Sequence, residues 1–444
     1  MSEKIISDPS VFLHNASLDE IERIAGKAVY GSKKNVKQLS VKDVSGNSGA
    51  KTFICSTGEV PKCIIKVKAS DSIMSSHPNT QKRVLAATRI LRQSSVAPPI
   101  LMNGGDFHIE RSAGISVMKD FFHFNEELAS PRKIARLLSQ LHSVPINWYD
   151  SLKEEFLNQD PTLNSILSPM PIHAPCWCLP WSGLDTLMPV MGVGNPDPKV
   201  AQEVLKLQIK TGVYKKVMQC DVFFPRSIAG KRQVVVHNDF KPDNILCNPE
   251  TRELTAIDYD LAQVGAAVMD FGLPYMMWLG SRFTNFQYRK NFIKFYLEYS
   301  SLPFDDDSVR EFMMDCEVNT LVAFPGLLSN IYDAEIPLLR GVLHPTAKSG
   351  FLASGPGVSP TGLEIIDLLA NVVEKIRLDE NLTNLTLENG LVMTVFQNKG
   401  FGSKELHSWL KEMQQNRMLR LFGIPEEDGS ELYVSKHAKK NYYT

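Results

Sequence analysis

The residues best suited to chemistry lie in the stretch HNDFKPDNIL, at positions 237–246. A short apolar run precedes His237, so a buried strand would deliver it to the start of a tight loop. Asp239 can point from that loop into a cleft, and Asn244 follows five residues later, near the next strand. Asp258 ends the apolar run after that and can face the same cleft. One carboxylate as base, with an amide and a second carboxylate as oxygen ligands, is the equipment of metal-assisted phosphoryl transfer.

The spacing of these residues is the main support for a catalytic role. A single Asp in a loop is usually a turn or capping residue, and a lone His-x-Asp carries little information. Here several polar positions fall at fixed offsets between two apolar runs. We therefore interpret the stretch as catalytic, with Asp239 as the base and Asn244 and Asp258 as ligands of Mg²⁺.

A lysine in the N-terminal part could complete such a site. Lys66 lies within the apolar run CIIKV at residues 63–67. A lysine in a buried strand needs an anionic partner, and a nucleotide phosphate would serve. The alternative is an edge-strand lysine whose amine reaches solvent. The Gly-containing turn at residues 45–49 precedes the next strand, where the backbone amides of Ser48 and Gly49 could approach phosphates.

The surrounding pattern predicts two lobes that would position these residues. The first 110 or so residues alternate strand-like and helical runs, which indicates a small α+β lobe. From Pro131 onward the apolar spacing is mainly helical. The elements expected in the first lobe are a helix within residues 1–30, strands at 36–41, 51–56, 63–68 and 107–110, and a helix at 80–93. Those expected later are strands at 234–236, 245–247 and 254–257 and helices at 200–217, 283–302, 308–332, 362–378 and 403–421.

Three regions follow from this organisation. We expect a nucleotide-binding lobe at 1–112, a helical catalytic and acceptor lobe at 113–385, and a C-terminal extension at 386–444. The stretch at 161–184 contains five prolines and is interpreted as an irregular insertion. The Gly-, Pro- and Ser-rich stretch at 345–361 is expected to be a mobile loop.

Composition excludes several classes of protein. The chain has 48 Lys and Arg against 49 Asp and Glu, a formal charge of −1, so it lacks the basic excess typical of nucleic-acid binding. Its seven cysteines are scattered and odd in number, which favours reduced thiols and a cytoplasmic protein. The N-terminus has no apolar signal core. The longest uncharged run is the proline-rich 161–184, so we expect no stable membrane insertion.

These motifs together resemble a known family. HNDFKPDNIL followed by AIDYDLAQVGAAVMDFG resembles the choline/ethanolamine kinase branch of the protein-kinase-like fold, near the aminoglycoside phosphotransferases. The segments ATRILRQSSVAPPIL and FMMDCEVNTLVAFPGLL resemble further parts of that branch, in the same order. The resemblance covers roughly residues 30–335. It implies an α+β bilobal protein-kinase-like fold, with a small N-terminal sheet lobe and a mainly helical C-terminal lobe.

The resemblance also implies roles by position. It makes ATP and Mg²⁺ the expected cofactors and a small-molecule alcohol the expected substrate. The roles it implies are catalytic base for Asp239, bracing of the loop for His237, Mg²⁺ ligation for Asn244 and Asp258, ATP phosphate contact for Lys66, adenine contact through backbone near Glu110 and Arg111, an acidic substrate-side position for Asp260, and a mainly structural role for Asp270.

The nucleotide lobe departs from the family pattern at one position. The helix glutamate that pairs with the lysine in the family falls at Val84, and no acidic residue occurs between Asp71 and Asp106. Either Lys66 is positioned in another way, or the affinity for ATP is reduced.

The acceptor pocket departs further. The family's two tryptophans fall at Pro325 and Leu328 and a carboxylate falls at Met277, although Trp278 remains. A cage for a trimethylammonium group would lose much of its cation–π attraction through these changes. Lys241 replaces a glutamine of the catalytic loop, and such a lysine would neutralise the transferred phosphoryl group and repel a cation.

The sequence therefore predicts an ATP- and Mg²⁺-dependent kinase for a small-molecule hydroxyl. A choline- or ethanolamine-type amino alcohol is the expected acceptor, which implies a place in phospholipid biosynthesis. Two alternatives stay open: a kinase for another hydroxylated metabolite, such as an aminoglycoside or a sugar, and a nucleotide-binding pseudokinase. Trp177 and Trp181 of the insertion form either a hydrophobic plug or a wall of the acceptor site. A homodimer is also left open.

Overall fold

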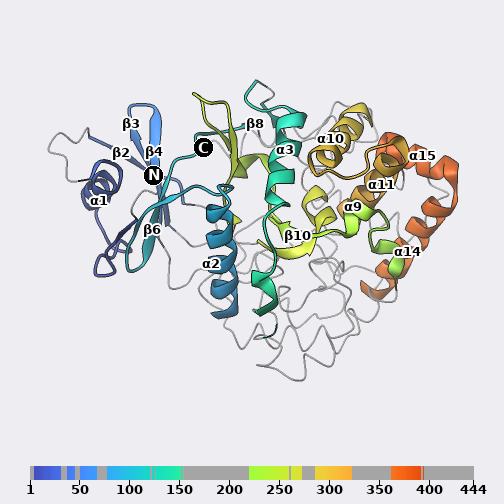
Figure 1. The fold of residues 1–444 in the computed structure, drawn as a ribbon, viewed down its shortest axis with the longest axis horizontal. Coiled ribbons are helices and arrows are strands. Elements are labelled where there is room, and N and C mark those ends of the chain that lie inside the picture. The colour runs from blue at the N-terminus through green and yellow to red at the C-terminus, as the bar shows by residue number, and fades with distance from the viewer. Residues whose placement is uncertain are drawn as a thin grey trace.

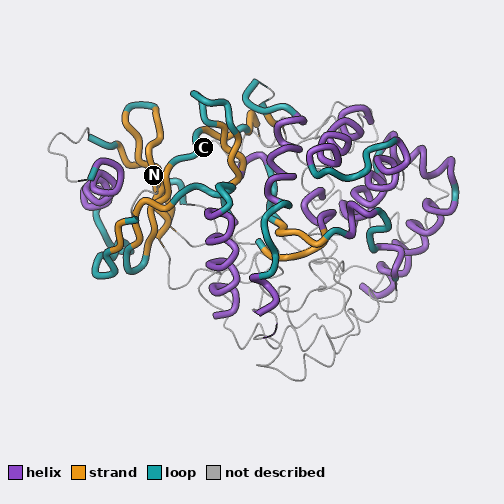
Figure 2. The backbone as a smooth tube through the Cα atoms, viewed as in Figure 1, coloured by secondary structure: helices purple, strands orange, loops and turns teal. Residues whose placement is uncertain are grey.

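The computed structural model describes the parts of the chain that carry most of the predicted site. These are residues 5–31, 38–45, 51–67, 78–120, 123–125, 127–151, 154, 220–259, 262–272, 286–322, 362–391 and 394. Figure 1 shows a sheet with helix α1 at one end of the molecule and a group of helices at the other. Figure 2 shows the same division, with most strands in one half and most helices in the other. The predicted α+β architecture with a sheet lobe and a helical lobe is confirmed.

The N-terminal lobe is built on a six-stranded sheet in the order β1-β5-β6-β4-β3-β2. Strands β2 to β6 are antiparallel to their neighbours, and the short β1 pairs with β5 in parallel. The bounds are β1 Ile6–Ser7, β2 Ser40–Asp43, β3 Lys51–Thr57, β4 Val60–Val67, β5 Ile100–Asn103 and β6 Phe107–Arg111.

The hairpin β3–β4 follows from its sequence. Gly58 lies in the turn with φ +59°, a conformation that glycine adopts without a steric penalty. Along β4 the side chains alternate, so that Cys63, Ile65 and Val67 are buried on one face. That face packs against helix α1 (Leu18–Tyr30) in the core of this lobe. The opposite face carries Lys66 and is directed away from α1.

Helix α2 (Pro78–Gln93) separates the sheet from the rest of the protein. In Figure 1 it lies between the strands of the N-terminal lobe and helix α3 (Pro131–Leu141). Ala87 and Leu91 are fully buried along it. Beyond its end, the amides of Val96 and Ala97 both donate to the carbonyl of Leu91, which closes the helix before β5.

The C-terminal lobe packs its helices around an aromatic core. Phe271 contacts Phe292, Tyr296 and Phe312 edge-on, with ring centroids 4.8–5.9 Å apart. The helices are α9 Ile228–Lys231, α10 Phe286–Tyr299, α11 Asp306–Val322, α14 Gly362–Leu378 and α15 Glu380–Asn389. The remaining strands are short: β7 Ile115–Ser116, β8 Met118–Asp120, β9 His123–Phe124, β10 Gln233–Val236, β11 Ile245–Cys247, β12 Leu254–Ala256 and β13 Gln263–Ala266.

Most of the predicted elements within the described residues are found, with shifted ends. The first helix begins only at Leu18, because Ser17 caps it by accepting a hydrogen bond from the amide of Glu20. The strand expected at 36–41 is β2, two to four residues further on. Helix α15 spans the boundary expected between residues 385 and 386. The predictions for 161–184, 200–217, 345–361 and 403–421 lie outside the described residues.

Two global expectations concern cysteines and membranes. The cysteines that the structure describes are free: Cys55, Cys63, Cys220, Cys247 and Cys316. None of the described helices combines the length and the apolar character that a membrane span requires.

A buried ion pair fixes three helices of the C-terminal lobe to one another. Arg289 of α10 and Glu317 of α11 form the pair with no solvent exposure. Arg289 also donates to the carbonyl oxygens of Leu387 and Glu388, at the end of α15. Glu317 in turn accepts from the amide of Leu391. Burial raises the pKa of Glu317, and the charge of Arg289 opposes that rise.

We predict that Arg289→Met lowers the free energy of unfolding by about 3–5 kcal/mol, because it leaves the Glu317 carboxylate buried without its partner. Lys290→Met is the matched control, since Lys290 pairs with Asp306, whose side chain is 85% exposed. Such a surface pair contributes less than about 1 kcal/mol. Urea unfolding of both variants gives the comparison, and equal losses would contradict the prediction.

Candidate active site

The candidate catalytic loop leaves a buried strand. Val234, Val235 and Val236 of β10 have at most 1% exposure and lead directly into His237. Strand β10 pairs with β13, so both ends of the loop region are tied to the same small sheet. Asn238 follows with φ +62°, the left-handed conformation that asparagine tolerates better than most residues.

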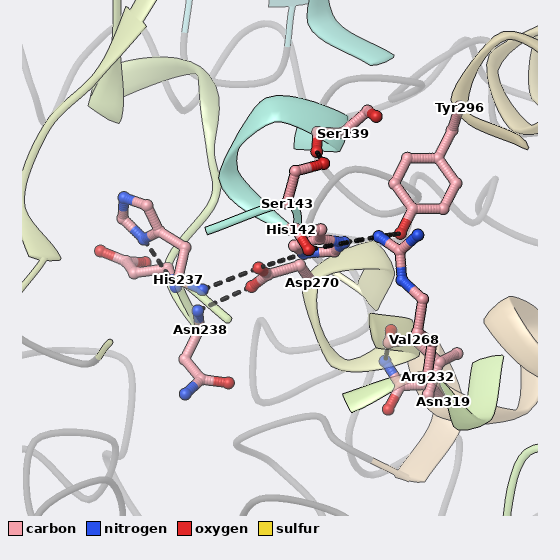
Figure 3. A network of polar contacts seen from close by, with 11 residues as sticks. Ser139, His142, Ser143, Arg232, His237, Asn238, Val268, Asp270, Tyr296 and Asn319 are labelled. Carbon is pink, nitrogen blue, oxygen red and sulfur yellow. Dashed lines mark hydrogen bonds and ion pairs between the residues drawn. The ribbon is translucent and has the colours of Figure 1, made fainter. Parts of the chain in front are cut away.

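Asp270 holds this loop from behind. It lies in the 3₁₀ turn Ala267–Phe271 that follows β13, and its side chain has no solvent exposure. Its two oxygens accept hydrogen bonds from the backbone amides of His237 and Asn238, each at 2.7 Å. Figure 3 shows both bonds converging on the carboxylate. The carboxylate thereby fixes the backbone at the residues just before Asp239.

His142, at the end of α3, supports Asp270 on its far side. Its Nε2 lies 3.0 Å from an Asp270 oxygen and its Nδ1 lies 2.7 Å from the hydroxyl of Tyr296. Burial lowers the pKa of His142 and raises that of Tyr296. A neutral His142 therefore donates from Nε2 to the carboxylate, and its Nδ1 accepts a hydrogen bond from the Tyr296 hydroxyl. The chain of bonds links α10, α3, Asp270 and the catalytic loop (Figure 3).

The ring of His237 connects the loop to the second acidic segment. Its Nε2 donates to the carbonyl oxygen of Ile257 at 2.8 Å. Its Nδ1 accepts from the amide of Asp239 at 3.3 Å. Since Ile257 precedes Asp258, the ring spaces the expected base and the expected metal ligand relative to each other.

Asp239 is held by two neighbours from its own loop. The amide nitrogen of Asn244 donates to the Asp239 backbone oxygen and to its carboxylate Oδ2, both at 2.8 Å. The amine of Lys241 lies 2.8 Å from the same Oδ2. Both side chains remain reachable from solvent, with 22% exposure for Asp239 and 28% for Lys241. The orientation of the carboxylate is therefore fixed without burying it.

Lys241 is a permanent cation in this arrangement. Burial alone would lower its pKa, but the carboxylates of Asp239, Asp243 and Asp258 outweigh that effect and raise it. The lysine thus carries its charge at neutral pH next to the expected base.

Lys66 and Asp258 join the two lobes at the site. The amine of Lys66 lies 3.6 Å from the Asp258 carboxylate. Asp258 adopts φ +66°, and the amide of Ile257 donates to the Asn244 carbonyl at 2.8 Å. Residues from β4, from the catalytic loop and from the segment after β12 therefore converge on one place. The structure brings together Lys66, His237, Asp239, Lys241, Asn244 and Asp258.

These residues fit a magnesium ion by their donor chemistry. The side-chain amide nitrogen of Asn244 donates to Asp239. The side-chain oxygen Oδ1 of Asn244 is therefore the atom left to act as a ligand. Together with the Asp258 carboxylate it offers two hard oxygen donors, and Mg²⁺ takes its remaining ligands from water and phosphate oxygens. Within the described residues, no group of three or more His, Cys, Asp or Glu side chains forms a separate metal cluster.

The remaining predicted site residues divide into two groups. Glu110 and Arg111, expected near the adenine, lie in β6, where the Arg111 amide donates to the Pro99 carbonyl at 3.0 Å. The Glu110 side chain is buried and forms an ion pair with Arg92 at 2.6 Å. Adenine contact through their backbone stays a prediction. Ser48, Gly49, Asp260 and Trp278 lie outside the described residues.

Asp243 is a site residue to which the sequence pattern assigned no role. It lies between Lys241 and Asn244, and burial raises its pKa, with the Asp239 charge acting in the same direction and Lys241 opposing. In the described part of the chain its Oδ1 is buried and accepts no hydrogen bond. Position alone could have placed it in the loop, but its burial depends on the tertiary fold.

The segment that carries this site matches a known protein family. Residues 184–312 match the model of the phosphotransferase enzyme family, and this segment contains the catalytic loop, Asp258 and Asp270. The match agrees with the class predicted from the sequence, a phosphotransferase enzyme.

Solved structures similar to this chain include small-molecule kinases. The Plasmodium vivax ethanolamine kinase is 14% identical with a TM-score of 0.44, over 79% of this chain and 95% of its own. The choline kinase of Cryptosporidium parvum Iowa II is 15% identical with a TM-score of 0.47, over 84% and 100%. An aminoglycoside phosphotransferase of Streptomyces rimosus is 14% identical with a TM-score of 0.36, over 68% and 99%. Among curated proteins there is no match.

We predict that Asp270→Asn releases the catalytic loop locally. Losing hydrogen bonds to a charged acceptor costs about 1.5–3 kcal/mol, so the amides of His237 and Asn238 should exchange their hydrogens at least about tenfold faster. Hydrogen exchange read by mass spectrometry on peptides from this loop gives the rate. Ser143→Ala is the control, because that hydroxyl donates to the Ser139 carbonyl within its own helix end. Unchanged exchange in Asp270→Asn would show that the carboxylate does not hold the loop.

A second prediction concerns Asp243 and pH. Its pKa is raised above the ordinary 3.8 in the folded state, so the carboxyl group lowers the stability as the pH rises above 3.8, and the loss is complete once the pH exceeds the folded pKa. Asp243→Asn should therefore raise the stability at pH 7 by about 0.5–2 kcal/mol, and the gain should vanish as the pH falls to 3.8. Urea midpoints across this pH range measure it. Glu250→Gln, in the exposed turn before β12, serves as control; a gain of equal size there would refute the assignment to Asp243.

Proposed function

We propose that this protein is an ATP- and Mg²⁺-dependent kinase that phosphorylates the hydroxyl group of a small molecule, with choline- or ethanolamine-type amino alcohols as the first acceptor class. The observation that carries the proposal is the convergence of Lys66 from the sheet lobe with Asp239, Asn244 and Asp258 from the other lobe. A phosphate-binding lysine, a base and two oxygen ligands are the groups that phosphoryl transfer requires. The match of residues 184–312 to the phosphotransferase family supports the same chemistry.

Each of these residues has a defined task in the reaction. Asp239 accepts the proton of the acceptor hydroxyl while the hydroxyl oxygen bonds to the terminal phosphorus of ATP and the bond from that phosphorus to ADP breaks. Lys66 binds phosphate oxygens from the sheet side. Asn244 and Asp258 would hold Mg²⁺, which supplies charge neutralisation on the phosphate oxygens when bound.

Lys241 bears on the choice of acceptor. Its amine lies 2.8 Å from Asp239, so it is adjacent to the place where the acceptor hydroxyl must lie. A cation there repels a quaternary ammonium group held close by, at about 4 kcal/mol for 4 Å near a protein surface. This observation favours the second candidate, a kinase for another hydroxylated metabolite, and within it a neutral sugar over a cationic aminoglycoside. The position of Asp260 near the acceptor remains part of the first proposal.

A nucleotide-binding pseudokinase is the alternative of a different class. It was suggested by the absence of an acidic residue from the helix expected at 80–93. The contacts among Asp239, Asn244 and Lys241 speak against it, because a protein without phosphoryl transfer has no need of an oriented, solvent-accessible base. The cytoplasmic location, the link to phospholipid biosynthesis and a homodimer stay predictions.

Release of ADP from Mg·ATP, measured across choline, ethanolamine, other amino alcohols, aminoglycosides and sugars, tests the proposed function. We expect acceptor-dependent turnover that falls about 10²- to 10⁴-fold in Asp239→Asn, since the variant keeps the size of the side chain but cannot take the proton. Asp221→Asn, an exposed acid of the same lobe, is the control and should retain full turnover.

The panel also separates the alternatives. Turnover with sugars or aminoglycosides alone would replace the amino-alcohol acceptor by the second candidate. Binding of Mg·ATP with no turnover on any acceptor would favour the pseudokinase. Full turnover in Asp239→Asn would exclude Asp239 as the base.

A further inference from the structure

The carboxylate that Lys66 lacks on helix α2 has a counterpart on the neighbouring strand. The sequence of α2, PNTQKRVLAATRILRQ, contains no acidic residue. Glu110 of β6 is a buried carboxylate in the same lobe, and its residue exposure is 7%. Burying a carboxylate without compensation is costly. The groups that stabilise the Glu110 carboxylate therefore indicate its role.

Strand register places Glu110 on the same face of the sheet as Lys66. Strands β4 and β6 are antiparallel neighbours, with Lys66 opposite His108 and Ile64 opposite Glu110. Residues two apart on a strand share a face, so Lys66, His108 and Glu110 all lie on the side away from α1. A diagonal pair of this kind is within reach of long side chains.

Helix α2 contributes a cation to this cluster instead of an acid. The Arg92 guanidinium donates to a Glu110 oxygen at 2.6 Å, and its Nε donates to the Pro98 carbonyl at 3.1 Å. The His108 ring lies 3.2 Å from the same Glu110 oxygen. Arg92 is therefore anchored at two points, and it fixes the carboxylate to the end of the helix.

The charge distribution connects Glu110 to Lys66. Burial alone would raise the pKa of Glu110, but the pKa is held well below its usual range, with Lys66 the strongest opposing influence, followed by His108 and Arg92.

We propose that Glu110 is the positioning residue for Lys66, taking the place of an acidic residue on α2. The Lys66 amine then has a carboxylate from β6 within its own sheet and the Asp258 carboxylate, at 3.6 Å, across the lobes. Arg92 and His108 keep Glu110 ionised and oriented. This inference rests on the proposed function, since it assigns Lys66 the task of binding ATP phosphates.

Two double-mutant cycles test the pairing. The first measures the dissociation constant of a fluorescent ATP analogue with Mg²⁺ in wild type, Glu110→Gln, Lys66→Met and the double variant. We expect Glu110→Gln to weaken binding about tenfold in the wild type and less than about twofold when Lys66 is already methionine. A merely structural glutamate would weaken binding by the same factor in both backgrounds.

The second cycle needs no nucleotide. Urea midpoints of the same four proteins show whether Lys66 and Glu110 stabilise each other in the folded state, which would make the shift of the double variant smaller than the two single shifts added together. Because Glu110→Gln leaves Arg92 without its partner, both cycles are repeated in an Arg92→Met background that removes this effect. Glu59→Gln, in the exposed turn between β3 and β4, is the matched control and should change neither measurement.

The outcomes separate the two proposals. Wild-type protein that fails to bind Mg·ATP would overturn the proposed function, while the urea cycle would still decide whether Glu110 holds Lys66. Wild-type binding with strictly additive effects in both cycles would overturn the role of Glu110 and leave the kinase proposal intact. Coupling in both cycles, retained with Arg92→Met, supports the inference.

Discussion

The site depends first on one buried carboxylate that takes its hydrogen bonds from the backbone. Asp270 accepts from two successive amides of the catalytic loop, and Asn238, one of the two, has a positive φ. A left-handed residue at the start of a functional loop is strained unless its surroundings hold it. The hydrogen bonds to Asp270 hold Asn238 in this conformation. The neutral ring of His142 donates a further hydrogen bond to the Asp270 carboxylate without adding a charge of its own. The positions of Asp239 and Asn244 follow from a backbone that has been fixed before either side chain acts.

The second organising feature is the alternation of charge across the lobes. Glu110, Lys66 and Asp258 form a sequence of negative, positive and negative groups that runs from the sheet into the C-terminal lobe. Lys241 and Asp239 continue the alternation within the loop. Each charged group has an opposite charge beside it, which lowers the cost of holding several ionised side chains in a partly desolvated place. A phosphate that binds here would replace a carboxylate as the partner of a lysine, because each lysine is already paired with a carboxylate before the phosphate arrives.

Local patterns in the sequence were sufficient for the loop and for the elements that carry it. The offsets among His237, Asp239, Asn244 and Asp258 are short-range, and the runs before and after them are apolar enough to be recognised as strands. The hairpin at Gly58 is likewise a local signal. The support for the loop is not local: His142 is 128 residues from Asp270 and 154 from Tyr296. Nothing near His142 in the sequence distinguishes it from a surface histidine, so its role depends on packing that periodicity does not describe.

The same reasoning explains why the sequence predicted only a backbone contact with adenine near Glu110 and no role for its side chain. A glutamate at the end of a strand is ordinarily exposed, and only the register of β4 with β6 shows that it lies diagonally from Lys66. The sequence shows that α2 contains no acidic residue. It does not show that Glu110, eighteen positions after Arg92 and on another element, lies beside that helix.

The bond between Arg92 and Glu110 has a consequence for how this enzyme could be controlled. A carboxylate on a helix can leave its lysine when the helix rotates, and such a rotation acts as an on–off device. A carboxylate on a strand beside the lysine's own strand cannot leave without breaking the sheet. With Glu110 positioning Lys66 as we propose, the carboxylate stays beside the lysine, and a displacement of α2 would withdraw only Arg92. Movement of this helix would thus change the activity gradually, by altering how firmly Glu110 is held beside Lys66, and would not switch the activity on or off.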